Sequence, residues 1–331
     1  MAARALRIGT RSSALALWQA RHVAALIAAQ PGAPAVELVH IKTEGDLRTD
    51  VPLWAVGGRA FFTKEIDRAL LANEVDLAVH SLKDLSTVLD PGIELAATLE
   101  REDSRDALLC VKAKTLRDLP AGSQVGTSSL RRRAFLAHAR PDLVTAELRG
   151  NVPTRLERLL EGKYDAIILA VAGLKRLELD QHIAERVDIK VFTPAVSQGA
   201  VGVCARTRDE DTLRWLRALD HRETRLATTA ERALLRRIEG GCQVPLGASA
   251  QVIGDALHLY VAVCALDGSE KLTAEGQTAI VANAAASTAA HASAALEAAA
   301  QLGRKLADDL LARGADKLIT RERADRAMEL P

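Results

Sequence analysis

The sequence predicts an α/β protein of three domains, and two observations support this. Short apolar runs alternate with amphipathic helical patterns through the first two thirds of the chain, which is typical of mainly parallel sheets covered by helices. After about residue 220 the order changes to a long helix, an antiparallel series of strands and an Ala-rich helix. A chain of 331 residues is long enough for two or three domains.

The first domain is expected to be an α/β lobe. Its expected elements are strands at 6–10, 35–41 and 75–81 and helices at 12–30 and 61–74. Ser12 or Ser13 is the expected N-cap of the first helix. The β-α-β-α-β order implies a parallel sheet with helices on its faces.

A second lobe repeats this order. Its expected elements are strands at 106–111, 123–128, 143–148 and 165–171 and helices at 129–139 and 152–163. The apolar segment 192–206 then breaks the pattern, and we expect it to cross back to the first sheet. The predicted domains are 1–100 with 198–220, 101–197, and a C-terminal α+β domain at 221–331.

The C-terminal domain should hold a helix at 223–239, antiparallel strands within 247–281 and the Ala-rich helix at 284–313. Its alanines are typical either of close helix packing or of a compositional bias, and we favour the bias. The charged residues 321–331 should be loose.

Composition excludes several classes of function. A net charge of +1 and an aromatic content of 3% argue against nucleic acid as a partner, because such proteins need basic surfaces and stacking platforms. No apolar run approaches the ~20 residues that span a bilayer, so we expect no membrane partner. The first residues lack the apolar core of a signal peptide, and we expect a cytoplasmic protein.

One of the four cysteines differs from the rest. Cys110, Cys204 and Cys264 lie in apolar runs that predict buried strands, where a thiol behaves as a small hydrophobe. Cys242 lies in "GGCQVP", and the glycines before it let a ligand approach. No Cys or His stands at metal-ligand spacing, so no metal is expected. A loop thiol without a role is the alternative interpretation.

Arginines and small hydroxyl residues recur where predicted strands end. Helix N-termini, hydroxyl groups and guanidinium groups all bind carboxylate or phosphate. Taken singly, each arginine could be a solvated surface charge, but their repetition at four junctions predicts a cleft for a ligand with several negative groups. The residues are Arg11 and Ser13; Ser128, Ser129, Arg131 and Arg132; Arg149 and Arg155; and Arg176.

Lys83 and Asp84 follow directly from an apolar strand in "VDLAVHSLKDLS". A carboxylate among cations stays ionised, and it can stabilise a developing positive charge or relay a proton. A plain Lys–Asp turn is the alternative.

These motifs together resemble the porphobilinogen deaminase (hydroxymethylbilane synthase) family over about residues 6–246. The resemblance rests on seven motifs that occur in order over long separations. They are "LRIGTRSSALALWQA", "AVHSLKD", "EREDSRDA", "VGTSSLRRR", "LRGNV" with "TRL", "YDAIILAVAGLKRL" and "EGGCQVPLG".

The resemblance implies two lobes like those of periplasmic binding proteins, a smaller C-terminal domain and a monomer. It implies a transferase that condenses four porphobilinogen molecules head to tail with loss of ammonia, and then releases hydroxymethylbilane by hydrolysis. A dipyrromethane cofactor, attached to Cys242 through a thioether, would prime the chain.

The resemblance also implies residue roles. Asp84 would bind pyrrole N–H groups and stabilise the azafulvenium cation that forms as ammonia leaves. The cofactor would be held by Lys83, Asp84, Ser129, Arg131, Arg132, Arg155 and Arg176. The substrate would meet Arg11, Ser13, Phe62, Arg149 and Arg155, with Arg59 nearby on a mobile lid.

Several positions depart from the family pattern. They are Ala14, Arg59, Ala60, Ser86, Pro153 and Ser197. None of them removes a charge from the expected cleft. Two rival functions stay open: a non-catalytic binding protein for a small anion, and a phosphate-handling enzyme, for which no Walker-type loop is present.

Overall fold

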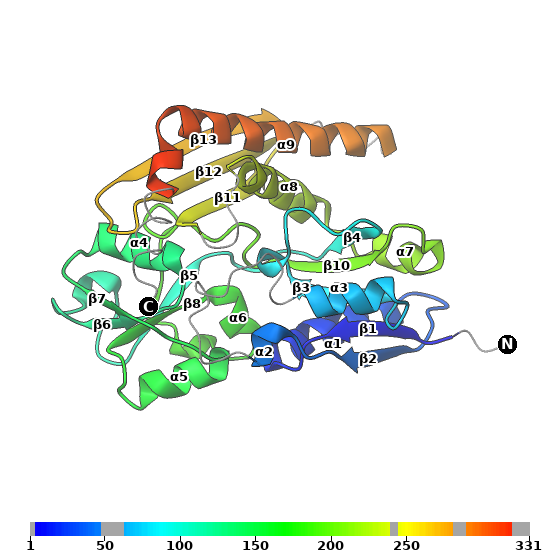
Figure 1. Cartoon of the computed structure of the whole chain (residues 1–331), viewed down its shortest axis with the longest axis horizontal. Helices are drawn as coiled ribbons and strands as arrows, with labels where there is room; N and C mark the ends of the chain where they lie inside the picture. The colour runs from blue at the N-terminus through cyan, green and yellow to red at the C-terminus, as the bar shows by residue number, and fades with distance from the viewer. Residues whose placement is uncertain (1–3, 48–62, 239–243, 281–288, 320–331) are drawn as a thin grey trace.

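Three sheets organise the protein in the computed structural model, which describes residues 4–47, 63–238, 244–280 and 289–319 (Figure 1). Two five-stranded sheets lie side by side, and a three-stranded sheet with two long helices lies across them. The predicted fold class, two α/β lobes and a smaller α+β domain, is confirmed. Within the described part, no helix is both long and apolar enough to cross a membrane.

The first lobe is built on the sheet β2-β1-β3-β10-β4. Its strands are β1 (Leu6–Thr10), β2 (Val36–His40), β3 (Leu77–Ser81), β4 (Ile93–Thr98) and β10 (Val201–Arg206). Four of them point the same way and β10 runs against them, because β10 pairs antiparallel with both of its neighbours. The helices are α1 (Ala14–Ala28), α2 (Glu44–Leu47), α3 (Lys64–Leu71) and α7 (Glu210–Arg217), with a 3₁₀ turn η1 (Leu82–Asp84).

The second lobe has the same plan, on the sheet β7-β6-β8-β5-β9. Its strands are β5 (Asp106–Cys110), β6 (Gln124–Gly126), β7 (Val144–Ala146), β8 (Ala166–Ala170) and β9 (Glu185–Arg186). Here β5 is the strand that runs against the other four. The helices are α4 (Leu130–Ala139), α5 (Val152–Leu160) and α6 (Val171–Arg176), with 3₁₀ turns η2 (Leu116–Asp118) and η3 (Asp180–His182).

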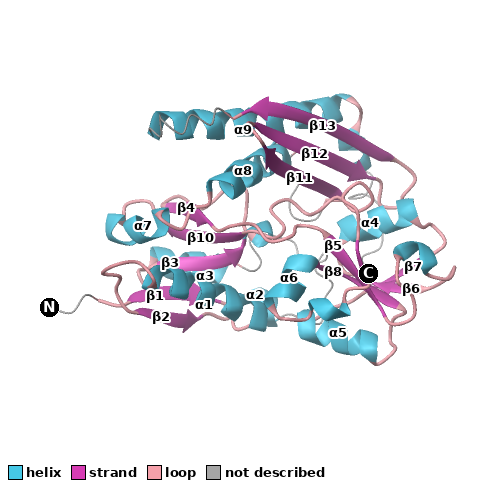
Figure 2. Cartoon of the chain, turned by 180° about the vertical axis from the view of Figure 1, so that it is seen from behind, coloured by secondary structure: helices cyan, strands magenta, loops and turns pink. Residues whose placement is uncertain are grey.

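The C-terminal domain packs two helices on one antiparallel sheet (Figure 2). Its elements are α8 (Arg222–Arg237), β11 (Leu246–Ile253), β12 (Ala256–Cys264), β13 (Lys271–Ala279) and α9 (Ala289–Ala312). The two helices approach closely at Gly303, where an added Cβ would lie 2.1 Å from the Ala230 carbonyl oxygen. Ala299 and Ala307 are fully buried beside it. Close helix packing therefore explains Ala299 and Ala307, whereas Ala292 and Ala294 are exposed, and compositional bias stays the prediction for the other alanines.

Two chain segments connect the lobes, and they run together. Leu99 and Glu102, in the first segment, donate backbone hydrogen bonds to Val201 and Gly199 in the second, at 3.0 and 3.2 Å. The second segment leads into β10, so the predicted return to the first sheet is confirmed. The predicted domain boundaries at single residues stay predictions.

The departures from the family pattern fit the backbone to different degrees. Ala14 and Pro153 both lie in the first turn of a helix. A first-turn N–H has no partner within the helix, so Pro153 removes no hydrogen bond there. Ser197 has φ of 62°, in the left-handed region that favours glycine, and its buried hydroxyl has no hydrogen-bond partner among the described residues. Ser197 is therefore a locally unfavourable choice.

The fully buried carboxylate of Glu231 on α8 joins the C-terminal domain to the two segments that connect the lobes. It accepts two hydrogen bonds from Arg101, at 2.6 and 3.1 Å, where the chain enters the second lobe. It also accepts from the backbone N–H of Ser197 in the return segment and of Ala250 on β11, at 2.6 and 2.7 Å. One carboxylate thus accepts four hydrogen bonds from donors in three separate segments.

We expect Glu231→Gln to lower the free energy of unfolding by about 3 kcal/mol, because it leaves the Arg101 guanidinium buried without its counterion. Denaturant titration measures the loss. Glu210→Gln is the matched control, since the exposed Glu210–Arg217 pair should change stability by less than about 0.5 kcal/mol. Equal effects of the two substitutions would contradict the role of Glu231.

Candidate active site

The predicted site residues lie at the carboxyl ends of parallel strands, on both lobes. Arg11 follows β1, and Lys83 and Asp84 form η1 after β3. In the second lobe Ser128 and Ser129 follow β6, Arg149 follows β7, and Arg176 ends the short helix after β8. In open α/β sheets this edge is where ligands bind.

Asp106, the first residue of β5, is the anion at the centre of this edge. Its carboxylate is fully buried and lies 2.7 Å from Arg131 Nη1 and 2.7 Å from Arg132 Nη2. Burial alone would raise the pKa of Asp106, but the charges of Arg131 and Arg132 hold it well below its usual range. Two buried guanidinium groups thus share one carboxylate, which leaves an excess of positive charge.

Backbone carbonyl groups fix the two guanidinium groups further. Arg131 Nη1 donates to the carbonyl of Thr193 at 2.6 Å, and Arg132 Nη1 donates to that of Ile168 at 2.8 Å. Arg131 Nε is buried and has no hydrogen-bond partner among the described residues. Some of the donors that were expected to bind a ligand, Arg131 Nη1 and Arg132 Nη1, therefore bind the protein itself. Arg131 Nε remains as a donor for a ligand.

Lys83 brings the first lobe into contact with this cluster. Its Nζ donates to Gln198 Oε1 at 3.2 Å, and Gln198 Nε2 donates to Asp106 at 3.0 Å and to the Ser104 carbonyl at 2.8 Å. Burial lowers the pKa of Lys83 to about 8; Asp84 and Asp106 oppose that shift, and Arg131 and Arg132 add to it. Lys83 and Asp84 therefore lie where the two lobes meet.

Arg149 and Arg155 extend the positive cluster along the second lobe. Arg155 donates through Nε to the Gly150 carbonyl at 2.7 Å. Burial, followed by the charges of Arg132 and Arg149, lowers its pKa to about 10. Arg155 also lies near the start of α5, where the helix dipole disfavours a cation, and the charges of Arg132 and Arg149 repel it further.

Arg176 and Arg11 lie in different surroundings. The Arg176 guanidinium lies 5.6 Å from the ring centroid of Trp18 on α1 and donates to the Gly199 carbonyl at 2.5 Å, and burial lowers its pKa to about 10. The charge of Arg11 acts on His80, a buried residue whose pKa falls to about 4, mainly through burial.

The predicted serines have local structural roles. Ser13 caps α1 and accepts from the Ala16 N–H at 3.3 Å, which confirms one of the two expected N-caps. Ser129 caps α4, and Ser128 donates to the Leu148 carbonyl. Cys204 and Cys264 are buried as expected, but Cys110 is only half-buried.

Cys242, Phe62, Arg59 and Ala60 lie outside the described residues. Two described residues that the sequence analysis did not single out are Asp106 and Gln198. Asp106 lies in the quoted motif "EREDSRDA", and Gln198 follows the irregular Ser197. A charged residue at the start of an apolar strand was the available signal for Asp106.

The arrangement favours binding of an anion with several charged groups. Lys83, Arg131, Arg132, Arg149 and Arg155 interact with one another or with shared neighbours. Asp84 and Asp106 are the carboxylates at Lys83, and Glu147 adds one more beside Arg155. Preorganised cations that repel each other are stabilised by an anionic ligand.

We expect the Lys83 amine to titrate near pH 8 in ligand-free protein, because burial disfavours its charged form. The site then loses a positive charge as the pH rises through about 8, and its affinity for succinate should fall. NMR of lysine labelled at Cε reads the midpoint, and calorimetry reads the affinity. Lys83→Arg should bind succinate with little pH dependence over the same interval. A Lys83 midpoint above about 10 would contradict the burial of its charge.

Comparisons with known proteins identify the family of the chain. The family model described as "Porphobilinogen deaminase, dipyromethane cofactor binding domain" matches residues 6–214, and the one described as "Porphobilinogen deaminase, C-terminal domain" matches residues 225–312. A porphobilinogen deaminase of Chloroherpeton thalassium is 48% identical over 269 residues, which cover 81% of this chain and 86% of that protein.

Similar solved structures include a periplasmic substrate-binding protein from Coxiella burnetii, with 14% identity, a TM-score of 0.42, and coverage of 65% of this chain and 91% of that one. A nutrient-binding protein from Burkholderia cenocepacia has 15% identity, a TM-score of 0.41, and coverage of 64% and 89%. The family models and the curated relative span both lobes and the C-terminal domain. The chain therefore belongs to the porphobilinogen deaminase family.

Proposed function

We propose that this protein is a hydroxymethylbilane synthase, a transferase that joins four porphobilinogen molecules on a dipyrromethane primer and releases the linear tetrapyrrole by hydrolysis. The observation that supports this best is the position of Lys83 and Asp84 against the Asp106–Arg131–Arg132 cluster, at the meeting of the lobes. Each pyrrole unit carries an acetate and a propionate, so the growing product needs many cations.

The residues present fit a dipyrromethane. Its carboxylates would accept a hydrogen bond from Arg131 Nε, which lacks a partner among the described residues. They would also offset the positive charges of Arg132 and Arg155, which repel each other. Lys83, Ser129 and Arg176 would complete the binding set. When bound, the group supplies the nucleophilic pyrrole carbon on which the chain is extended. Cys242 would hold it as an anchor, bonded through every turnover.

Asp84 would act on the incoming substrate. Its carboxylate would accept hydrogen bonds from the pyrrole N–H, stabilise the positive charge that develops as ammonia leaves, and help remove the proton after the carbon–carbon bond forms. Arg11, Ser13, Phe62, Arg149 and Arg155 would bind the substrate side chains. We further propose a cytoplasmic monomer without a nucleic-acid or membrane partner.

A non-catalytic anion-binding protein is the rival, and it would have no use for Cys242. We expect the native protein, made in cells that produce porphobilinogen, to weigh more than its sequence by one dipyrromethane. Cys242→Ser should show the sequence mass, and Cys110→Ser, a half-buried strand cysteine, should keep the added mass. Intact-mass spectrometry measures all three. A native mass equal to the sequence mass would refute the proposal.

Removing the Asp84 carboxylate should slow turnover by orders of magnitude without preventing primer attachment. We expect Asp84→Ala to lose about 10²- to 10⁴-fold in rate, because a developing cation then lacks its counterion. Asp84→Asn keeps the shape without the charge and should be similarly slow. Rates come from product formation, and the added mass confirms that the primer is present. Near-normal turnover of Asp84→Asn would show that its charge has no part in the reaction.

A further inference from the structure

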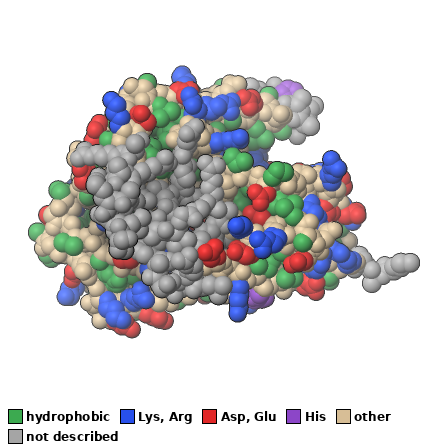
Figure 3. All heavy atoms as spheres, in the orientation of Figure 1, with side chains coloured by type: hydrophobic (Ala, Val, Ile, Leu, Met, Phe, Trp, Pro, Cys, Tyr) green, Lys and Arg blue, Asp and Glu red, His purple; other side chains and the backbone are tan. Residues whose placement is uncertain are grey.

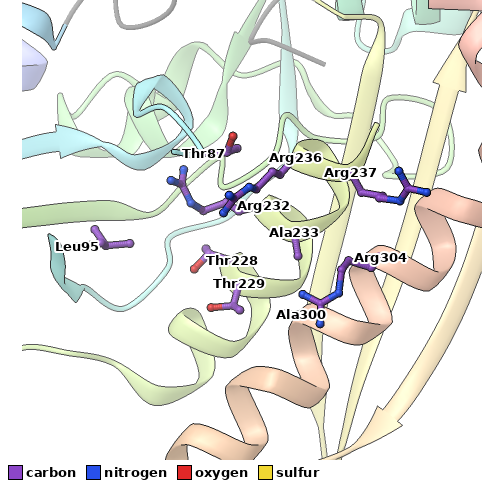
Figure 4. A pocket seen from close by; sticks show the side chains of 10 residues that line it. All are labelled: Thr87, Leu95, Thr228, Thr229, Arg232, Ala233, Arg236, Arg237, Ala300 and Arg304. Atoms are coloured by element: carbon purple, nitrogen blue, oxygen red, sulfur yellow. The ribbon is translucent and has the colours of Figure 1, made fainter. Parts of the chain in front are cut away.

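A second group of arginines surrounds a pocket between the C-terminal domain and the first lobe (Figure 4). The pocket volume is about 520 Å³, within the range of sites that bind small molecules. Arg232, Arg236 and Arg237 come from α8 and Arg304 comes from α9, while the first lobe contributes uncharged side chains. Figure 3 shows Lys and Arg side chains gathered over these two helices.

The lining of this arginine pocket carries one sign of charge. Four of its 10 lining residues are arginines, and none is acidic. Arg237 pairs with Asp308 at 2.7 Å and Arg304 pairs with Glu297 at 2.5 Å, and both pairs are exposed. Exposed ion pairs contribute little, so a ligand with several charges can compete for these guanidinium groups.

The helix dipole explains the positions of only some of these arginines. Arg236 and Arg237 lie in the last turn of α8, where cations interact well with the helix dipole. Arg232 lies one turn earlier, and Arg304 belongs to the other helix and points towards α8 (Figure 4). Side chains from two helices converge on the same space, which helix capping does not require.

The arginine pocket is also connected to the segment that follows Asp84. Arg232 donates to the carbonyl oxygens of Leu85 and Ser86, at 3.1 and 2.5 Å. These carbonyls carry no formal charge, and they follow directly from Asp84 in the chain. A ligand that holds Arg232 in place therefore also restrains the backbone next to Asp84.

We propose that the arginine pocket binds a small anion with two or more carboxylate or phosphate groups, separately from the site between the lobes. The bound anion bridges α8 and α9 through Arg236 and Arg304, and it stabilises the backbone at Leu85 and Ser86 through Arg232.

Calorimetry on the complete protein with its covalent group tests this proposal. The probes are citrate, pyrophosphate and, at matched ionic strength, acetate. The variant is Arg236→Ala/Arg304→Ala, and the matched control is Arg208→Ala/Arg217→Ala, which likewise removes two exposed arginines, one of them ion-paired. We expect the affinity of the double variant for citrate or pyrophosphate to be at least about ten-fold lower than that of the native protein, and the affinity of the control to be unchanged. The preferred probe distinguishes a carboxylate site from a phosphate site.

Hydrogen exchange provides a second readout, independent of activity. The preferred probe should protect the amides of residues 85–88 in the native protein and in the control, but not in the double variant. Equal affinities of the native protein and the double variant would overturn the proposal, even if the variant melts at a lower temperature. Protection that persists in the double variant would overturn the link to Asp84.

Discussion

The buried carboxylate of Asp106 is the interaction on which the site depends. Arg131 and Arg132 are almost fully buried, and burying two guanidinium groups without a counterion would cost several kcal/mol each. One carboxylate offsets part of that cost and still leaves positive charge, which Lys83, Arg149 and Arg155 increase. With Asp84 and Glu147 counted, five cations lie near three carboxylates, so the site keeps a net positive charge. A ligand with several anionic groups relieves this imbalance.

A second buried carboxylate, Glu231, stabilises the place where the C-terminal domain contacts the two segments that connect the lobes. The Asp106 cluster and Glu231 both bind residues of these connecting segments. Glu231 binds Arg101 and Ser197, and Gln198, the next residue, binds Lys83 and Asp106. The position of the lobes is thereby coupled to the position of the cations between them. A change in the angle between the lobes, at the two connecting segments, would alter the distance between Lys83 and Asp106, which belong to different lobes.

Periodicity and strand-end chemistry predicted most of the fold and most of the cationic residues. The elements β4, β9 and α7 were not foreseen. A two-residue strand such as β9 gives little periodic signal, whereas α7 is strongly amphipathic and its pattern was overlooked. Arg131 and Arg132 illustrate a different limit. Their position was predictable, but their pairing depends on Asp106, which lies 25 residues earlier on a strand that runs against its neighbours. Ser13 looked like a ligand residue, and the structure also gives it the local role of a helix cap.

The strand β10 has a consequence for how the chain folds. It lies between β3 and β4, at the interior of the first sheet, yet more than a hundred residues separate it from either partner. During synthesis the first lobe emerges with a gap in its sheet that is filled only after the entire second lobe has been made. Contacts this distant in sequence slow folding and leave strand edges open to incorrect pairing in the meantime. The second lobe can form its own sheet without waiting for the first, so the lobe that starts the chain should be the later of the two to complete its fold.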